Sequence, residues 1–314
     1  MEGRLLITGA SGFVGQALVD ACQAAGIAWL GQASGLTPRS PAAAPPFIMA
    51  NLAEDFDWTP HLKGVGAVVH LAGVAHTNIG QGEARERMRR INVQAAADLA
   101  EQAVAGKIPR FVFVSSQHAG SWESGDQGVG FYGEAKKDAE EAIRKRTAGS
   151  LTSLAILRPC LMLGKGVRGN LASLMRWIDL GVPFPLGGVE NRRSIMNVRN
   201  FADLILACLR RPEPLDGVYA ASDGAVYSTP ELLRRIAAAL GRKVRLLPIP
   251  ASYIRGLAKL LGQTSRAEKL LGDSYVDSKP LWDELAWKPV FSAEAAFQEM
   301  ASAWRERGGK APAG

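Results

Sequence analysis

The chain opens on the run LLITGASGFVG, in which a strand-like segment leads through three glycines into a helical pattern. Residues 4–8 are apolar as in a strand, and 16–25 repeat apolar side chains at helical spacing. Gly9, Gly12 and Gly15 allow a tight turn, close approach of a phosphate and close packing of helix on strand. Free N–H groups and the positive dipole end of a helix favour an anion there. The run predicts a dinucleotide site; a purely structural turn is the alternative, because the spacing departs from G-x-G-x-x-G.

The choice of dinucleotide depends on the end of the second strand, where NAD sites usually place Asp or Glu about 20 residues beyond the glycines. The segment IAWLGQASGLTPR has neither, and the expected position falls near Gln32, Ala33 or Ser34. Arg39 would suit a 2′-phosphate as a fork-shaped donor. Alternatively, Arg39 lies in a solvated Pro-rich loop, and Ser34 or the backbone holds the ribose. Both NAD and NADP stay open, and the pattern favours NADP.

Composition and charge limit the partners of the chain. Its 314 residues carry a formal net charge of +7 and a pI near 9.4, but the basic residues are scattered over segments that look like solvated helix faces. Neither zinc spacing nor a nucleic-acid motif accompanies them. We therefore expect an anionic nucleotide ligand, with no nucleic acid and no metal.

Cysteine usage and hydropathy indicate the compartment. Cys22, Cys160 and Cys208 lie far apart without a C-x-x-C pair, which predicts neither a disulfide framework nor a structural zinc site. The first strand begins almost at once, and no apolar run reaches membrane-spanning length. We expect a cytoplasmic protein without a transmembrane segment.

Strand-like runs alternate with helical patterns, which predicts an α/β fold built on a parallel sheet. The clearest strands cover 5–8, 67–71, 111–114, 154–157 and 218–221. Helices are expected over 83–105, 133–146 and 198–210.

A doubly wound, Rossmann-type sheet with a smaller C-terminal α/β lobe is the expected architecture, because glycine and proline become frequent after Pro159. The NAD(P)-binding domain is expected over 1–163, with 194–222 returning to it. The substrate lobe then comprises 164–193 and 223–308, and 309–314 form a disordered tail.

Tyr132 and Lys136 lie four residues apart in the run YGEAK, so both fall on one face of the expected helix. Tyrosine ordinarily titrates near pH 10, too high for efficient proton transfer at neutrality. A cation about 4 Å away at an effective dielectric near 20 contributes roughly 4 kcal/mol, which predicts a Tyr132 pKa about three units lower before desolvation. In the reductive direction Tyr132 would then protonate a forming alkoxide. The alternative is an ordinary amphipathic helix with a solvated lysine.

Five motifs occur in the order of a known family: TGASGFVG, HLAG at 70–73, VSS at 114–116, YGEAK, and RP at 158–159. Through them the chain resembles, over most of its length, extended short-chain dehydrogenases/reductases of the NAD-dependent epimerase/dehydratase family, which act on nucleotide sugars. Within that family it is similar to bacterial enzymes of polysaccharide assembly, UDP-sugar 4-epimerases or reductases of UDP-4-keto-6-deoxy-N-acetylhexosamines. The resemblance implies an enzyme with NAD or NADP, a UDP-sugar substrate and a homodimer.

The resemblance also implies a role for each matched residue. Ser116, Tyr132 and Lys136 are the expected catalytic residues, with Ser116 bound to the substrate oxygen and Lys136 also holding the nicotinamide ribose. Ser115 is the alternative hydroxyl, because a slip of one residue exchanges the two serines. The expected coenzyme-binding residues are Gly9, Ser11, Gly12, Phe13, Val14, Gly15, Ser34, Arg39, Asn51, Leu52, Leu71, Ala72, Gly73, Asn92, Ser115, Tyr132, Lys136 and Pro159. The expected substrate-binding residues are His76, Ser116, Gln117, His118, Tyr132, Asn170, Leu171, Arg193 and Asp273.

Gln117 and His118 argue against the related sugar 4,6-dehydratases, which carry an acid pair directly after the catalytic hydroxyl. Elimination of water needs one group that removes a proton and another that protonates the leaving hydroxyl, and glutamine titrates for neither task. His118 is interpreted either as a substrate contact or as a structural histidine, and the same two readings apply to His70 and His76.

Asn170 and Arg193 are expected near the UDP diphosphate by resemblance, and a guanidinium suits phosphate through charge-assisted, often bidentate contacts. A helix cap and a surface cation are the alternatives. Related epimerases have an arginine a few residues before the final GD, where this chain has two leucines at 270–271. Arg266 or Lys269 would be the replacement.

The stretch 252–271 repeats apolar residues at helical spacing beside several basic ones. We favour helices packed within the substrate lobe. The alternative is a basic amphipathic surface that meets a membrane.

Reduction at C4 of a UDP-4-keto-6-deoxy-N-acetylhexosamine is the preferred function, because a reductase exchanges its coenzyme at each turnover and so suits NADPH. C4 epimerisation of a UDP-hexose or UDP-N-acetylhexosamine with retained NAD is the alternative. A non-catalytic dinucleotide sensor is a third candidate, which the retained serine, tyrosine and lysine disfavour.

Overall fold

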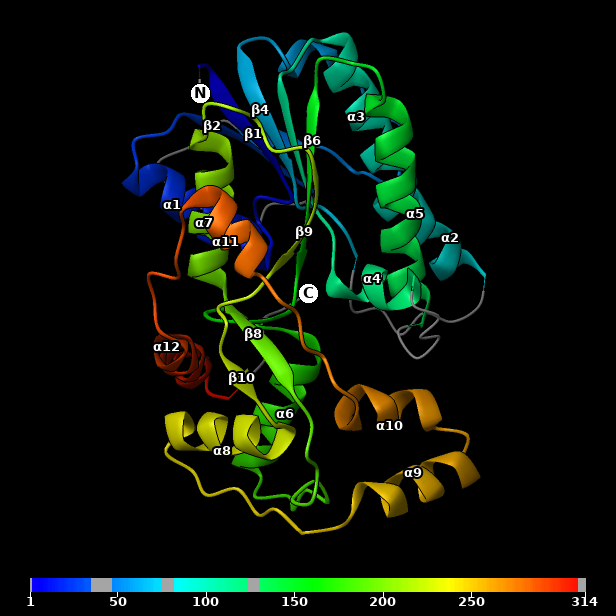
Figure 1. The fold of residues 1–314 in the computed structure, drawn as a ribbon, viewed down its shortest axis with the longest axis vertical. Coiled ribbons are helices and arrows are strands. Elements are labelled where there is room, and N and C mark those ends of the chain that lie inside the picture. The colour runs from blue at the N-terminus through cyan, green and yellow to red at the C-terminus, as the bar shows by residue number, and fades with distance from the viewer. Residues whose placement is uncertain (1, 35–46, 75–81, 124–129, 310–314) are drawn as a thin grey trace.

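Seven parallel strands form the larger of two sheets in the computed structural model, which describes residues 2–34, 47–74, 82–123 and 130–309 (Figure 1). The strand order is β3-β2-β1-β4-β5-β6-β9, so the order reverses between β1 and β4. Ligands of open α/β sheets bind beyond the carboxyl ends of the strands at such a reversal. The bounds are β1 Arg4–Thr8, β2 Trp29–Ala33, β3 Phe47–Met49, β4 Val65–His70, β5 Arg110–Val114, β6 Ser153–Pro159 and β9 Gly217–Ala221.

Helices cover both faces of this sheet (Figure 1). On one face lie α1 (Phe13–Ala24), α7 (Val198–Arg210) and α11 (Lys279–Leu285). The other face carries α2 (Glu83–Arg89), α3 (Ala95–Ala105), α4 (Gln117–Glu123) and α5 (Gly130–Thr147). Leu5 and Ile7 of β1 belong to the core beneath α1 and α7, whereas Leu6 belongs to the core beneath α3 and α5. The strands therefore read as continuous apolar runs, because alternate side chains meet different helix layers.

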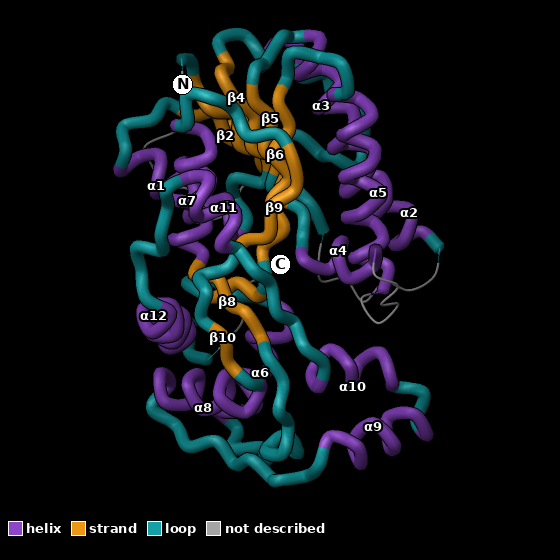
Figure 2. The backbone as a smooth tube through the Cα atoms, viewed as in Figure 1, coloured by secondary structure: helices purple, strands orange, loops and turns teal. Residues whose placement is uncertain are grey.

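A smaller sheet with helices around it forms the lower part of the molecule (Figure 2). Its strand order is β10-β8-β7, with β8 parallel to β7 and antiparallel to β10. The strands are β7 Leu161–Leu163, β8 Arg193–Asn197 and β10 Val226–Tyr227. The helices are α6 Gly169–Asp179, α8 Thr229–Leu240, α9 Ala251–Leu260, α10 Thr264–Leu271 and α12 Ala293–Glu306.

The predicted α/β class with a Rossmann-type parallel sheet is confirmed, and the five predicted strands are present within a few residues. The predicted helix over 83–105 is not one α-helix, because a π-helical turn, Arg90–Gln94, separates α2 from α3. This turn contains Asn92, and π-turns inside helices often mark functional positions. A 3-10 turn, Thr59–His61, precedes β4.

All three cysteines are buried and free. Within the described ranges, none of the helices combines the length and hydrophobicity that crossing a bilayer requires. Those ranges likewise contain no cluster of three or more His, Cys, Asp or Glu side chains arranged for a metal ion.

Candidate active site

The turn between β1 and α1 is shaped by its glycines. Gly9 has φ +65°, and a Cβ on Gly15 would lie 2.2 Å from the Gly9 carbonyl oxygen. Gly12 is the N-cap of α1 and provides no side-chain hydrogen bond to the first N–H groups of the helix. These backbone donors therefore fit the phosphates of a dinucleotide. The partly exposed residues of the same turn are Ser11, Phe13 and Val14.

Gln32 supports this turn from below. Its side chain is buried, its Oε1 accepts a hydrogen bond from the Gly9 N–H at 3.0 Å, and its Nε2 donates to the Ala50 carbonyl at 2.8 Å. Sequence reasoning considered Gln32 only as a position near the ribose and missed this role. Ser34, directly after β2, is exposed, whereas Arg39 lies outside the described residues.

Thr8 and His70 lie at the ends of the two strands that flank the reversal. Thr8 Oγ1 lies 2.8 Å from His70 Nδ1 and also accepts hydrogen bonds from the N–H groups of Leu71 and Ala72. The Thr8 hydroxyl proton is thus assigned to Nδ1, which leaves the proton of neutral His70 on Nε2. Burial, with a smaller contribution from the Lys136 charge, lowers the pKa of His70 to about 3. Burial and the hydrogen bond with Thr8 favour the structural reading of His70.

Asn92 fixes the loop that follows β4. It is buried; its Oδ1 accepts a hydrogen bond from the Val74 N–H at 2.7 Å, and its Nδ2 donates to the Val74 carbonyl at 3.0 Å. A Cβ on Gly9 would lie 2.9 Å from the Ala72 backbone, and a Cβ on Gly73 would lie 3.6 Å from Lys136 Nζ. The loop therefore lies between the glycine turn and the lysine of YGEAK.

Ser116 and Tyr132 are brought together at the carboxyl end of β5. Burial raises the pKa of Tyr132 to about 12, and a hydrogen bond with the Ser116 side chain acts in the opposite direction. The Ser116 Oγ also accepts a hydrogen bond from the His118 N–H at 3.2 Å. The His118 ring meets the Tyr132 ring edge-on, with centroids 6.3 Å apart.

Lys136 is buried one helical turn beyond Tyr132 in α5. Its Nζ donates a hydrogen bond to the Val114 carbonyl at 2.9 Å and lies 4.9 Å from the centre of the Phe113 ring. Burial lowers the pKa of Lys136 to about 8, while the charge of Glu140 acts to raise it.

The predicted lowering of the Tyr132 pKa is wrong for this structure. The pKa of the Tyr132 phenol is raised to about 12, because burial disfavours the charged phenolate. The expected lowering was that of the Lys136 charge before desolvation, and the Lys136 ammonium is turned toward the Val114 carbonyl.

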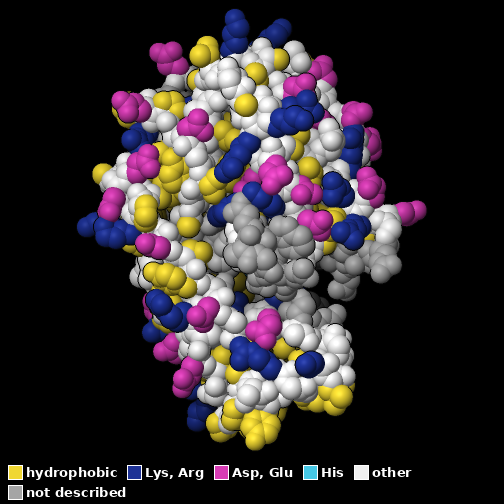
Figure 3. Space-filling view, turned by 45° about the vertical axis from the view of Figure 1, so that its right-hand side comes forward, with side chains coloured by type: hydrophobic (Ala, Val, Ile, Leu, Met, Phe, Trp, Pro, Cys, Tyr) yellow, Lys and Arg dark blue, Asp and Glu magenta, His cyan; other side chains and the backbone are white. Residues whose placement is uncertain are grey.

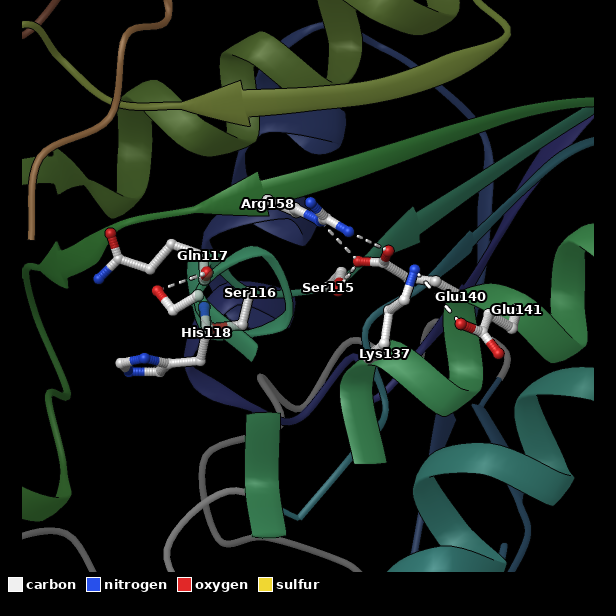
Figure 4. A network of polar contacts seen from close by, with 9 residues as sticks. Ser115, Ser116, Gln117, His118, Lys137, Glu140, Glu141 and Arg158 are labelled. Carbon is white, nitrogen blue, oxygen red and sulfur yellow. Dashed lines mark hydrogen bonds and ion pairs between the residues drawn. The ribbon is translucent and has the colours of Figure 1, made fainter. Parts of the chain in front are cut away.

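The two neighbouring serines point to different partners (Figure 4). Ser115 Oγ donates a short hydrogen bond, 2.5 Å, to Glu140 Oε1. Arg158 binds both oxygens of the same carboxylate at 2.9 and 2.6 Å, and Glu140 is fully buried. The two serines therefore have different partners: Ser115 donates to the carboxylate of the buried Glu140–Arg158 ion pair, and Ser116 contacts Tyr132. The motifs did not single out Glu140 or Arg158 in this pairing.

A second polar group lies where the small sheet meets the segment after α10. Arg193 Nη1 donates to the Lys269 carbonyl at 2.9 Å, and Asp273 Oδ1 accepts from the Arg192 N–H at 2.8 Å. Burial lowers the pKa of Arg193, and the Asp273 charge opposes that shift. Gln117 Nε2 donates to Ser274 Oγ at 2.7 Å, so this segment also contacts the start of α4.

The remaining predicted positions are spread around these groups. Asn170 is exposed at the second residue of α6, whereas Leu171 is buried in the lower core. Asn51 is exposed and donates to Glu54, whereas Leu52 and Pro159 are buried. His76 lies outside the described residues, as does the side chain of Arg266.

The chain matches the model of the NAD dependent epimerase/dehydratase family over residues 5–220. It is 30% identical to a UDP-glucose 4-epimerase of Vibrio cholerae, in an alignment that covers 97% of this chain and 96% of that protein.

Solved structures share the fold. One is MoeE5 in complex with UDP-glucuronic acid and NAD, with a TM-score of 0.76 at 19% identity over 97% of this chain and all of that one. Another is a UDP-N-acetylglucosamine 4-epimerase from Bacillus cereus, with a TM-score of 0.73 at 18% identity over 96% of this chain and 99% of that one. With the family match over 5–220 and the relative aligned along nearly the whole length, the chain is an enzyme of the NAD-dependent epimerase/dehydratase family.

Proposed function

We propose that this enzyme interconverts UDP-sugars that differ in configuration at C4, with NAD as its retained coenzyme. The observation that carries the proposal is the meeting of Ser116 and Tyr132 beside the buried Lys136, next to the loop that packs on the glycine turn. The Vibrio cholerae relative, named a UDP-glucose 4-epimerase, favours epimerisation over the reduction that the sequence analysis preferred. Reduction of a UDP-4-keto-sugar gains no specific support from that relative and stays the second candidate.

NAD is proposed over NADP for two reasons. MoeE5 was solved with NAD, and an epimerase returns the hydride it removes, so it needs no exchange of coenzyme. The glycine turn and the uncapped start of α1 would hold the phosphates. Ser34 or the backbone beside it would hold the adenosine ribose of NAD. When bound, NAD would accept the hydride that leaves C4 of the sugar, and the reduced coenzyme would return it.

Tyr132 would exchange the proton on the C4 oxygen, while Ser116 would hold that oxygen by a hydrogen bond. The protonated Lys136 would favour the phenolate that Tyr132 must become when it acts as a base. Burial raises the Tyr132 pKa to about 12 while the Lys136 ammonium donates to the Val114 carbonyl, so this mechanism requires Lys136 to act on the phenol as a charge held one helical turn away.

Arg193 would bind the diphosphate of the UDP-sugar, because a guanidinium has five N–H donors and one of them is used on the Lys269 carbonyl. Asn170, exposed at the start of α6, is the second candidate for that group. On this proposal, 1–163 and 194–222 bind the coenzyme, and 164–193 and 223–308 bind the substrate. The two sheets do not follow these bounds at every point, because β7 and β8 belong to the small sheet and α11 packs on the large one. A homodimer stays a proposal, to be measured by analytical ultracentrifugation.

In the experiment, purified enzyme is incubated with UDP-glucose in one reaction and with UDP-N-acetylglucosamine in another. The C4 epimers are then resolved by chromatography. Interconversion without net change in coenzyme absorbance at 340 nm is the expected outcome for at least one of these substrates. Stoichiometric oxidation of reduced coenzyme with a UDP-4-keto-6-deoxy-sugar, and no epimerisation, would establish the reductase instead.

A further inference from the structure

Helix α9 leaves an apolar stripe exposed. Tyr253 is 72% exposed, Leu257 59% and Leu260 83%, and Leu261, which follows the helix, is 62% exposed. Spacings of four and three residues place the first three on one helix face. Ala258 is the buried residue of this helix. Packing within the substrate lobe, which the sequence analysis favoured for this stretch, therefore does not account for these side chains.

The chain around α9 is strongly basic. Between Glu231 and Glu268 the sequence contains no Asp or Glu, and its cationic residues there are Arg234, Arg235, Arg242, Lys243, Arg245, Arg255, Lys259 and Arg266. Three of these arginines pair with carboxylates elsewhere: Arg235 with Glu294, Arg242 with Asp179 and Arg255 with Glu268. Lys243, Arg245 and Lys259 are exposed, and no carboxylate of the described residues pairs with them. Of these three cations without a paired carboxylate among the described residues, Lys259 lies on α9 itself, and Lys243 and Arg245 lie in the segment that leads into it.

Two further apolar side chains are exposed on the segments that precede α9 in the fold. Leu247, 45% exposed, precedes α9, and Val182, 39% exposed, lies two residues before Phe184. The Phe184 N–H donates to the Arg245 carbonyl and the Leu247 N–H donates to the Phe184 carbonyl, both at 2.8 Å, so the two segments lie side by side. Figure 3 shows hydrophobic side chains gathered at the lower end of the molecule, with Lys and Arg side chains close above them.

We propose that this surface, formed by Val182, Leu247, Tyr253, Leu257, Leu260 and Leu261, binds an anionic lipid bilayer. Exposed leucines on one face of a basic helix suit the boundary between headgroups and acyl chains, where tyrosine also prefers to lie. The unpaired cations attract anionic headgroups at the same time. A second copy of this chain is a poorer occupant, because two copies would bring the same positive surplus together.

The lipid-binding surface is joined to the candidate site through α10. Arg193 donates to the carbonyl of Lys269, near the end of that helix. Asn191 donates to the carbonyls of Leu270 and Gly272 at 3.1 and 2.9 Å. Docking of α9 would therefore hold the candidate diphosphate-binding side of the enzyme close to the bilayer. The inference concerns binding alone and does not depend on the reaction at C4.

The test is co-sedimentation of the full-length chain with vesicles of phosphatidylcholine alone and of phosphatidylcholine mixed with phosphatidylglycerol. We expect binding to the anionic vesicles that weakens as salt is raised. A Leu257→Glu, Leu260→Glu double variant should bind at least about tenfold more weakly, because it removes two apolar contacts and adds repulsion. The matched control is Leu151→Glu, whose side chain is 94% exposed in the loop before β6 and far in sequence from α9.

A second variant tests the contribution of the cations without changing any leucine. Lys243→Gln combined with Lys259→Gln should weaken binding to anionic vesicles and leave the thermal unfolding temperature unchanged, since both side chains are exposed. The proposal is overturned if the unaltered chain does not sediment with anionic vesicles, or if Leu151→Glu weakens binding as much as the α9 variant. It is also overturned if the α9 variant turns a dimer into a monomer in sedimentation velocity without changing vesicle binding, which would make this a self-association surface.

Discussion

The Lys136 ammonium donates a hydrogen bond to the Val114 carbonyl oxygen at 2.9 Å, which ties the cation of YGEAK to the strand end that carries the two serines. The ammonium is buried there and lies over the Phe113 ring. The position of the ammonium is therefore fixed by its contacts. Whether the side chain carries a charge then depends on the pH.

Turnover should decline as the pH rises through about 8. Burial lowers the pKa of Lys136 to about 8, so the charge is present at neutral pH and lost above that value. The measurement is the pH profile of kcat/KM. Lys136→Arg keeps a cation, since guanidinium titrates above about 12, and should move the alkaline decline upward even at a lower overall rate. An alkaline decline at the same pH in both proteins would mean that another group controls it.

The two serines should differ in the readout that they affect. Ser116→Ala removes the hydroxyl that meets Tyr132 and should lower kcat by about ten- to a hundredfold while leaving the unfolding midpoint nearly unchanged. Ser115→Ala removes a donor to the buried Glu140 and should lower stability by about 1 to 3 kcal/mol with a smaller effect on kcat. Steady-state kinetics and urea unfolding of both variants check this. The reverse pattern would exchange the roles of the two serines.

Gln32 should control coenzyme affinity from a buried position. Gln32→Leu leaves the Gly9 N–H and the Ala50 carbonyl without their partner, which costs about 1 to 3 kcal/mol. When this cost weakens the glycine turn that holds NAD, NAD affinity falls by about tenfold or more, while UDP affinity stays constant. Isothermal titration with each ligand measures this. Gln23→Leu, on the exposed side of α1, is the control. Equal NAD affinity in both variants would argue against a supporting role for Gln32.

His70 should make the protein sensitive to acid. Its folded-state pKa of about 3 lies below the ordinary 6.5, so below pH 6.5 the unfolded chain binds a proton that the folded protein excludes. This group leaves stability unchanged above pH 6.5 and lowers it as the pH falls toward 3, by at most about 1.4 kcal/mol per pH unit.

His70→Gln removes that proton, so the free energy of unfolding should fall less steeply with decreasing pH than in the unaltered chain. Urea unfolding at several pH values from about 7 to 4 gives the two slopes. His61→Gln, at a partly exposed position, is the control. Parallel slopes for the unaltered chain and His70→Gln would show that His70 is protonated in the folded protein.

The sequence predicted the parts of the fold that depend on local pattern. The apolar run before Gly9 became β1, and the helical repeat after Gly12 became α1, because strand, turn and helix signals agree there. The spacing of YGEAK placed Tyr132 and Lys136 in α5, one turn apart. These are short-range relationships that residue spacing can specify.

The parts that were missed depend on contacts between distant segments. Gln32 turned inward because Gly9 and Ala50 lie on either side of β2 in the folded sheet. The Tyr132 pKa rose because burial outweighed a charge that pointed elsewhere, and spacing along a helix does not give the desolvation of a phenol. The apolar repeat of α9 indicated a helix correctly but could not say which face stayed exposed.

The most direct test of the proposed chemistry is the rate of C4 epimerisation of a UDP-sugar by Tyr132→Phe beside the unaltered enzyme. The phenol should carry the proton of the C4 oxygen, so kcat should fall by a factor of about 10² to 10⁴ while NAD and UDP bind as before. Epimerisation by Tyr132→Phe at the unaltered rate would contradict the account.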